Sequence, residues 1–294
     1  MGAHHDCDVL VVGSGAGGAP TAAILAEAGL DVLVVEEGPW VEQGEVVPFS
    51  LEQMDRQYRN GGLTVALGRP SIAYTEGRCA GGGTEVNSGL YRRPSEQTLD
   101  RWRAGWKIAD FASDDFMARC DEVEAALSVQ TVPGRHTPAS ERLRAGAEAL
   151  RWAHDEIPRW MTYPDGPDAA TGRRQSMTRT YLPRATTAGA RLLTDTRVDR
   201  LILDHGRAFR AELTTGDGEP ATVDFAHVIV CAGAIHTPAL LQRSGLRGPI
   251  GRRLAVHPTV KLAARFDEVV NVGDDVPVHQ VKEFAHDLSF GGSA

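Results

Sequence analysis

Hydrophobic residues near the start of the chain form two short runs on either side of an alanine-rich stretch. The first run covers residues 9–12 and leads directly into a glycine-rich turn, and the second covers residues 32–35. Runs of four apolar residues bounded by turn residues are typical of buried strands. The stretch between them, about residues 17–28, is followed by Gly29, which predicts a helix that ends at a glycine. The pattern therefore predicts a strand–helix–strand unit.

The turn before this helix carries Gly13, Gly15 and Gly18 in the spacing GxGxxG, and Glu36 follows the second strand. The first glycine permits a tight turn, the second lets a pyrophosphate approach the backbone, and the third lets helix and strand pack closely. The helix N-terminus favours phosphate, and the acid can bind ribose hydroxyls. These features together predict a dinucleotide site; the alternative is an ordinary strand–helix–strand unit with a glycine-rich turn.

The middle of the chain reads as helices followed by a loop. An apolar face at Phe116, Cys120, Val123 and Leu127 predicts a core-facing helix, with Asp114 as its N-cap. The elements expected between the first unit and residue 190 are a helix near 50–59, helical structure over 95–127, a helix at 140–151 and a loop at 158–177.

Strand patterns return late in the chain, at 192–194, 198–203, 207–214 and 226–233. The last of these is apolar and ends at Gly233, and a helix is expected over 237–244, with Thr237 as N-cap, Pro238 at the first helical position and Gly245 after its end. A domain that binds only a nicotinamide cofactor needs no such late strand. In FAD-binding folds a late strand of this type returns to the first sheet, with its glycine end near the flavin. The late strand thus favours FAD.

Composition narrows the class of protein. Of the 294 residues, 42% are hydrophobic and 24% charged, and the net charge is −8, which favours a soluble globular protein and argues against nonspecific nucleic-acid binding. No basic segment followed by a long apolar run opens the chain, and the apolar runs are too short to span a bilayer, so a cytoplasmic protein is expected. The four cysteines form no CxxC and the ten histidines form no HxxxH or HExxH, so no metal site is predicted.

Three segments together resemble the glucose-methanol-choline (GMC) oxidoreductase family. One is the GxGxxG turn with its acid. Another is similar to the family's first signature, and the last is similar to its second signature. The two signature-like segments are Gly77-Arg78-x-x-Gly81-Gly82-Gly83-Thr84-x-Val86-Asn87-x-x-x-Tyr91 and Gly233-Ala234-x-x-Thr237-Pro238 with Leu240-Leu241 and Ser244-Gly245-Leu246. The matches, with a continuation at Gly251 to Pro258, extend over residues 9–258.

The resemblance implies an α/β fold and a cofactor site. The fold would be a Rossmann-like FAD-binding domain, a parallel sheet with helices on both faces, with an inserted, incomplete α+β substrate domain. The expected boundaries are 1–94 and 186–258 for the first domain, and 95–185 and 259–294 for the second. The implied contacts are the FAD pyrophosphate for Gly13, Gly15 and Gly18, the adenosine ribose for Glu36, the adenine for the Val198 backbone, and the flavin side for Arg78, Gly82, Gly83, Asn87 and the glycine end at Gly233.

The implied chemistry is alcohol oxidation, in which a base takes the hydroxyl proton while the carbinol hydride passes to the flavin. The substrate class would be a small-molecule alcohol, with the electron acceptor unassigned and no nucleic-acid partner. Because no imidazole lies near Asn87, the FAD is expected to be noncovalent. The alternatives are another FAD- or NAD-dependent dehydrogenase, or a non-catalytic nucleotide-binding domain.

The sequence departs from the family at Ala80 and Arg247, and most of all at its end, Ala294. The family's catalytic histidine lies in a later segment, so a truncated chain is expected, poorly soluble, weak in FAD binding and inactive with alcohols, with apolar surface exposed near residues 259–290. No catalytic residue is assigned. The better interpretation of four histidines is structural, with His257 the first to test: His236, His257, His279 and His286.

Overall fold

The computed structural model describes residues 2–42, 44–48, 50–106, 113–256, 260–270, 278–285 and 288–292. The chain divides into two compact units, the first made of Met1–Asn87 with Ser176–Val260 and the second of Ser88–Gln175 with Lys261–Ala294. The domain boundaries expected after residues 94, 185 and 258 remain a prediction. The second of these boundaries falls inside helix α6 (Tyr181–Thr187), which packs against α1 in the first unit.

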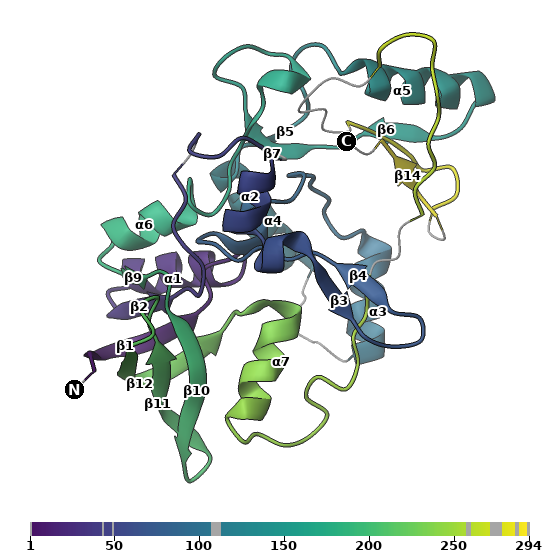
Figure 1. Cartoon of the computed structure of the whole chain (residues 1–294). Helices are drawn as coiled ribbons and strands as arrows, with labels where there is room; N and C mark the ends of the chain where they lie inside the picture. The colour runs from purple at the N-terminus through teal and green to yellow at the C-terminus, as the bar shows by residue number, and fades with distance from the viewer. Residues whose placement is uncertain are drawn as a thin grey trace. The chain divides into compact units, whose positions relative to one another are not determined.

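The first unit is built around one large sheet (Figure 1). Its helices are α1 (Gly18–Glu27), α2 (Leu51–Gln57), α6 (Tyr181–Thr187) and α7 (Gly233–Arg243), with short 3-10 turns at Arg59–Gly62 and Gly82–Glu85. Its strands are β1 (His4–Val12), β2 (Val32–Val35), β3 (Thr64–Ala66), β4 (Ile72–Tyr74), β9 (Arg191–Leu193), β10 (Arg197–Asp204), β11 (Arg207–Thr214) and β12 (Pro220–Val230).

The six strands of the large sheet lie in the order β10-β11-β12-β1-β2-β9. Strands β12, β1, β2 and β9 pair in parallel, whereas β10, β11 and β12 form an antiparallel meander. The late strand therefore returns to the first sheet beside β1, as the sequence predicted, with Val12 opposite Val230. The carboxyl ends of β1, β2 and β12 lie at the same edge of the sheet.

Helices cover both faces of this sheet at β1. Side chains alternate between the two faces of a strand. Leu10 and Val12 belong to a buried cluster that also contains Leu240 of α7. Val11 points the opposite way, within reach of the position that a side chain at Gly18 of α1 would occupy. Because both faces are covered, β2 is buried at every position, which is typical of parallel strands.

The second unit combines helices with two small antiparallel sheets, in the orders β14-β13-β6 and β5-β7-β8. Helix α5 packs against β13. Its elements are α3 (Glu96–Trp106), α4 (Ser113–Ala126), β5 (Val129–Gln130), α5 (Pro138–Leu150), β6 (His154–Glu156), β7 (Arg159–Thr162), a 3-10 turn at Ala169–Thr171, β8 (Arg173–Arg174), β13 (His279–Val281) and β14 (Phe290–Gly291).

Three local predictions are wrong in detail. Helix α4 begins at Ser113, so Asp114 lies in its first turn rather than capping it. Helix α7 begins at Gly233, so Pro238 lies inside the helix, although Gly245 follows its end as expected. Residues 158–177 are not all loop, because β7 and β8 pair with each other there. In the last of these, Pro and Gly residues favour a loop, but the pairing of β7 with β8 overrides that local preference.

The apolar surface that the sequence predicted near residues 259–290 is found in the first part of that range, whereas Val278 and Val281 are buried. Val260, Leu262 and Val269 are 86%, 94% and 85% exposed. Among the described residues, no helix combines the length and the hydropathy needed to cross a membrane.

Candidate functional site

A cavity of about 910 Å³ opens in the first unit where three parallel strands end. Gly13 follows β1, Glu36 follows β2 and Cys231 follows β12, and all three line the cavity. In open α/β sheets, ligands bind outside the carboxyl ends of the strands. The volume lies in the range of small-molecule and cofactor sites, roughly 300 to 1,000 Å³.

Two glycine-rich loops that are far apart in the sequence form one wall of this cavity. A Cβ atom placed on Gly82 would lie 3.1 Å from the Cα of Gly15, so the two backbones approach as closely as glycines permit. A Cβ on Gly83 would meet no atom within 4 Å. The wall is therefore backbone with no side chain in front of it, which lets a ligand reach the amide groups.

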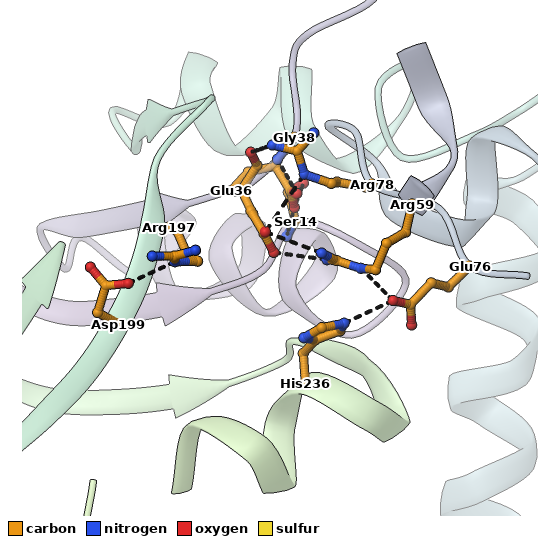
Figure 2. Close-up of polar contacts among 10 residues, drawn as sticks. Ser14, Glu36, Gly38, Arg59, Glu76, Arg78, Arg197, Asp199 and His236 are labelled. Atoms are coloured by element: carbon orange, nitrogen blue, oxygen red, sulfur yellow. Dashed lines mark hydrogen bonds and ion pairs between the residues drawn. The ribbon is translucent and has the colours of Figure 1, made fainter. Parts of the chain in front are cut away.

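Ser14 and Glu36 hold the two loops together. The Ser14 hydroxyl donates to Glu36 Oε2 at 2.7 Å (Figure 2). It also accepts from the backbone amide of Gly81 at 3.0 Å. Glu36 also accepts from the Ser14 amide at 3.0 Å and from the Gly38 amide at 2.9 Å. Ser14 is fully buried and Glu36 is 8% exposed. This network fixes the second glycine loop against the first.

Burial raises the pKa of Glu36 above the usual glutamate value, and the hydrogen bonds from Gly38 and Ser14 offset only part of this effect. The three hydrogen bonds use three of the roughly four lone-pair positions of the carboxylate. Glu36 therefore mainly holds the loops of the site in place, and one lone-pair position of its carboxylate is left for a ligand hydroxyl.

A chain of charged side chains crosses another wall of the cavity. Arg59 donates to Glu37 through two nitrogens, at 3.1 and 2.8 Å, and its Nε forms an ion pair with Glu76. Glu76 in turn contacts Nε2 of His236 at 2.8 Å (Figure 2). Arg59, Glu37, Glu76 and His236 all line the cavity, and His236 comes from the first turn of α7.

The Arg59 guanidinium controls the ionisation of this chain. Burial alone would raise the pKa of Glu37, but hydrogen bonding and attraction to Arg59 hold it below its usual value. The pKa of Glu76 is also lowered, because His236 and Arg59 together outweigh its burial. Both carboxyl groups are thus ionised near neutral pH, and their stabilising effect is present above a pH of about 4.5.

Replacing Arg59 by glutamine is expected to destabilise the first unit in a pH-dependent way. Glu37 and Glu76 would lose their shared partner, at a cost of roughly 1 to 3 kcal/mol at pH 7, between the values for exposed and buried pairs. Because the folded pKa values of both acids are lowered, the contribution disappears as the pH falls below 4.5 through those values. The difference between parent and variant in urea denaturation should therefore shrink at low pH.

Arg56→Gln is the matched control, because Arg56 pairs with Glu45 and Glu52 on the exposed surface. Its effect should stay below about 1 kcal/mol. An Arg59→Gln variant that loses no more than this control at pH 7, or equally much at every pH, would contradict the assignment.

Seven of the ten positions expected to bind the cofactor line the cavity, and they are Gly13, Gly15, Glu36, Gly82, Gly83, Val198 and Gly233. Gly18, Arg78 and Asn87 are not among the lining residues. Gly18 packs against the turn at Gly13, and the Arg78 guanidinium lies beside Glu37. The backbone N–H of Asn87 donates to the Gly83 carbonyl.

Sequence reasoning missed Ser14, Arg59 and Glu76. Ser14 occupies a variable position of the GxGxxG turn, and its only sequence signal is a small polar residue between glycines. Arg59 and Glu76 lie outside the motifs, and Glu76 reaches His236 across 160 positions. His257 and His286 lie outside the described residues.

Cys79, inside the second glycine loop, is a packing residue. Its side chain is fully buried, and burial raises the pKa of its thiol further than the neighbouring Glu85 and Glu36 do. The thiol therefore stays protonated and is not a nucleophile.

Comparison with known families gives two matches. A model of the GMC oxidoreductase family matches residues 54–259, and a model of an FAD-binding domain matches residues 6–44. An uncharacterised GMC-type oxidoreductase of Sinorhizobium fredii is 41% identical, over 98% of this chain and 59% of its own length. A long-chain-alcohol oxidase of Arabidopsis thaliana is 30% identical, over 89% of this chain and 37% of its own length. The chain spans about half the length of the curated relatives it matches.

Two solved structures share the fold. Pyridoxine 4-oxidase from Mesorbium loti superposes with a TM-score of 0.61 at 20% identity, covering 82% of this chain and 52% of that one. An FAD-dependent oxidoreductase from Chaetomium thermophilum gives a TM-score of 0.65 at 19% identity, covering 81% and 47%. At these identities the likeness concerns the fold alone.

Proposed function

The chain belongs to the GMC oxidoreductase family, and from this premise we propose that it forms the FAD site of an enzyme that oxidises an alcohol to a carbonyl compound. The observation that carries the proposal is the pair of glycine loops, which meet at the carboxyl ends of β1 and β2 and face a cavity of about 910 Å³.

The residues of the cavity fit the chemical groups of FAD. The backbone at Gly15 and Gly83 leaves room for a pyrophosphate, because no atom of the protein lies close in front of it. At Gly13 the space beside Cα is filled by the Cys231 carbonyl, so that glycine serves the tight turn. The remaining lone-pair position of Glu36 suits a ribose hydroxyl. Val198 lines the cavity at the start of β10, where its backbone can border an adenine ring.

A bound FAD supplies the hydride acceptor for oxidation of a CH–OH group. The protein itself binds and orients the cofactor and places the charged side chains of Arg59, Glu37 and Glu76 in the wall of its cavity. Nε2 of His236 is engaged by Glu76, which also pairs with Arg59. We therefore assign no catalytic base to this chain. The names of the Arabidopsis relatives support an alcohol as the substrate class.

The test is anaerobic reduction of the flavin in the FAD-loaded protein. We expect one FAD per chain and slow bleaching by primary alcohols, because no base is assigned among the described residues and general-base catalysis typically contributes about 10²- to 10⁴-fold to the rate. Bleaching by a nicotinamide cofactor, with none from any alcohol, would support a different dehydrogenase. Fast turnover would show that a histidine of this chain is the base, and His257 and His236 would be replaced in turn.

The FAD is expected to be noncovalent. Residues 77–91 contain no histidine, and the Cys79 thiol is buried and protonated. Acid precipitation should therefore release all of the flavin into the supernatant, where its absorbance is measured. Flavin that remains in the washed pellet of the denatured protein would contradict this prediction.

A further inference from the structure

Five titratable side chains gather in the second unit, between α5 and the β6–β13 pair. Directly opposed residues of antiparallel strands lie on the same face. His279 of β13 is opposite Glu156 of β6, and His154 lies two positions before Glu156 on that strand, so these three share a face. His136 immediately precedes the cap of α5 and Glu141 lies in its first turn, and both reach the same place.

Three ligand atoms of this group converge. Nδ1 of His136 lies 2.9 Å from Oε1 of Glu141 and 3.1 Å from Nε2 of His279. All three atoms lie within 4.8 Å of one another. His279 is 6% exposed, and the His136 side chain is 18% exposed. The two histidines are therefore largely shielded from water, whereas the Glu141 side chain is 40% exposed.

Protonation alone does not satisfy the hydrogen-bonding atoms of this cluster. A single proton on Nδ1 of His136 would have to bond both the Glu141 oxygen and the His279 nitrogen. Nε2 of His136 faces Oε2 of Glu156 at 3.5 Å, which favours a proton on that nitrogen and leaves the lone pair of Nδ1 directed into the cluster.

We propose that His136, Glu141 and His279 bind a divalent cation of the zinc class. Two imidazole nitrogens and one carboxylate oxygen form a ligand set typical of Zn²⁺, with water at the remaining position. Metal–ligand bonds of about 2.0–2.2 Å place tetrahedral ligand atoms roughly 3.3–3.6 Å apart, so the 2.9 and 3.1 Å separations from His136 need only small shifts. The Glu141 and His279 ligand atoms lie within 4.8 Å of each other, and a bound ion would set their separation.

The surroundings suit a cation. Glu141 Oε2 is held by Arg144, which leaves Oε1 for the metal. Glu156 adds a second negative charge beside His136. A bound ion would link the start of α5 to β13, across 143 positions of sequence, and so stabilise the second unit. No local histidine motif signals this site, because its ligands meet only in the folded chain.

The test is titration of the metal-free, full-length chain with Zn²⁺ against a chromophoric chelator. We expect one equivalent of Zn²⁺ to bind. His279→Asn should weaken Zn²⁺ binding at least about a hundredfold, because loss of a hydrogen-bond partner of a metal ligand already lowers affinity by about 10- to 100-fold and loss of the ligand itself should cost no less. Co²⁺ in place of Zn²⁺ should give the visible absorption of a four-coordinate site. The unfolding midpoint of the parent should rise with Zn²⁺.

Two variants keep the result interpretable. Glu141→Gln lies on the exposed side of the cluster and should fold even if His279→Asn does not, and it should weaken Zn²⁺ binding as well. The double variant His4→Asn, His5→Asn removes two histidines that are adjacent in the sequence and belong to β1 of the first unit. It should bind Zn²⁺ like the parent. A parent that binds Zn²⁺ no tighter than Glu141→Gln, or a loss of binding in the His4–His5 variant alone, would overturn the proposal.

Discussion

An alanine at position 18 is expected to destabilise the first unit by about 3 kcal/mol or more. A Cβ atom there would lie 1.8 Å from the Gly13 carbonyl oxygen and 3.2 Å from a methyl group of Val11. The nearest atom belongs to the backbone at the end of β1, so relief requires moving α1 off the sheet. Overpacking of this kind costs about 1–3 kcal/mol or more, and it outweighs the roughly 1 kcal/mol by which alanine favours a helix.

The neighbouring Gly17 gives the matched control. A Cβ at Gly17 would lie 3.4 Å from the Cys231 sulfur and 3.7 Å from its Cβ, which are ordinary contacts. Gly17→Ala should change the urea midpoint of the FAD-free protein little, while Gly18→Ala should lower it strongly or prevent folding. Equal midpoints for the two variants would show that α1 is free to move away from β1.

Valine at position 15 is expected to abolish FAD binding while the chain still folds. The nearest protein atoms to a Cβ at Gly15 would be the Gly82 Cα at 3.8 Å and the Gly81 carbonyl oxygen at 3.9 Å. A side chain therefore fits the protein but occupies the wall of the cavity. Excluding a pyrophosphate from this wall should weaken FAD binding at least about a hundredfold, or about 2.8 kcal/mol.

Flavin fluorescence quenching in titrations with FAD measures this loss. Gly15→Ala should show a smaller loss in the same direction, which excludes a folding defect caused by the larger valine. Gly146→Val is the control, because Gly146 lies in α5 of the other unit with no atom within 4 Å of its added Cβ. Unchanged FAD affinity in Gly15→Val would mean that the pyrophosphate binds elsewhere.

Much of the first unit could be predicted because its signals are local. The four-residue apolar runs, the GxGxxG turn and Gly29 together predicted β2, α1 to within one residue at each end, and the carboxyl end of β1, which begins earlier, at His4. The apolar run that ends near Gly233 predicted β12. In each case the side chains that cause burial, or the glycine that permits a left-handed turn, lie inside the element itself.

Sequence reasoning failed where a local signal competed with distant contacts. Thr237 and Pro238 form a good helix start, yet α7 begins at Gly233, directly after β12. Pro and Gly residues over 158–177 predicted loop, yet β7 pairs with β8 and with β5. Propensity is a weak prior that tertiary pairing overrides.

The sequence by itself determined the glycine loops, the acid after β2 and the family to which the chain belongs, because spacing along the backbone is sufficient for those. Only the tertiary structure decided what the polar side chains do. It joins Ser14 to Gly81 across 67 positions, His236 to Glu76 across 160 and His279 to His136 across 143. Hydrogen bonds and ion pairs act over about 3 Å of space, whatever the separation along the chain, so no pattern of spacing reveals such partners before the chain folds.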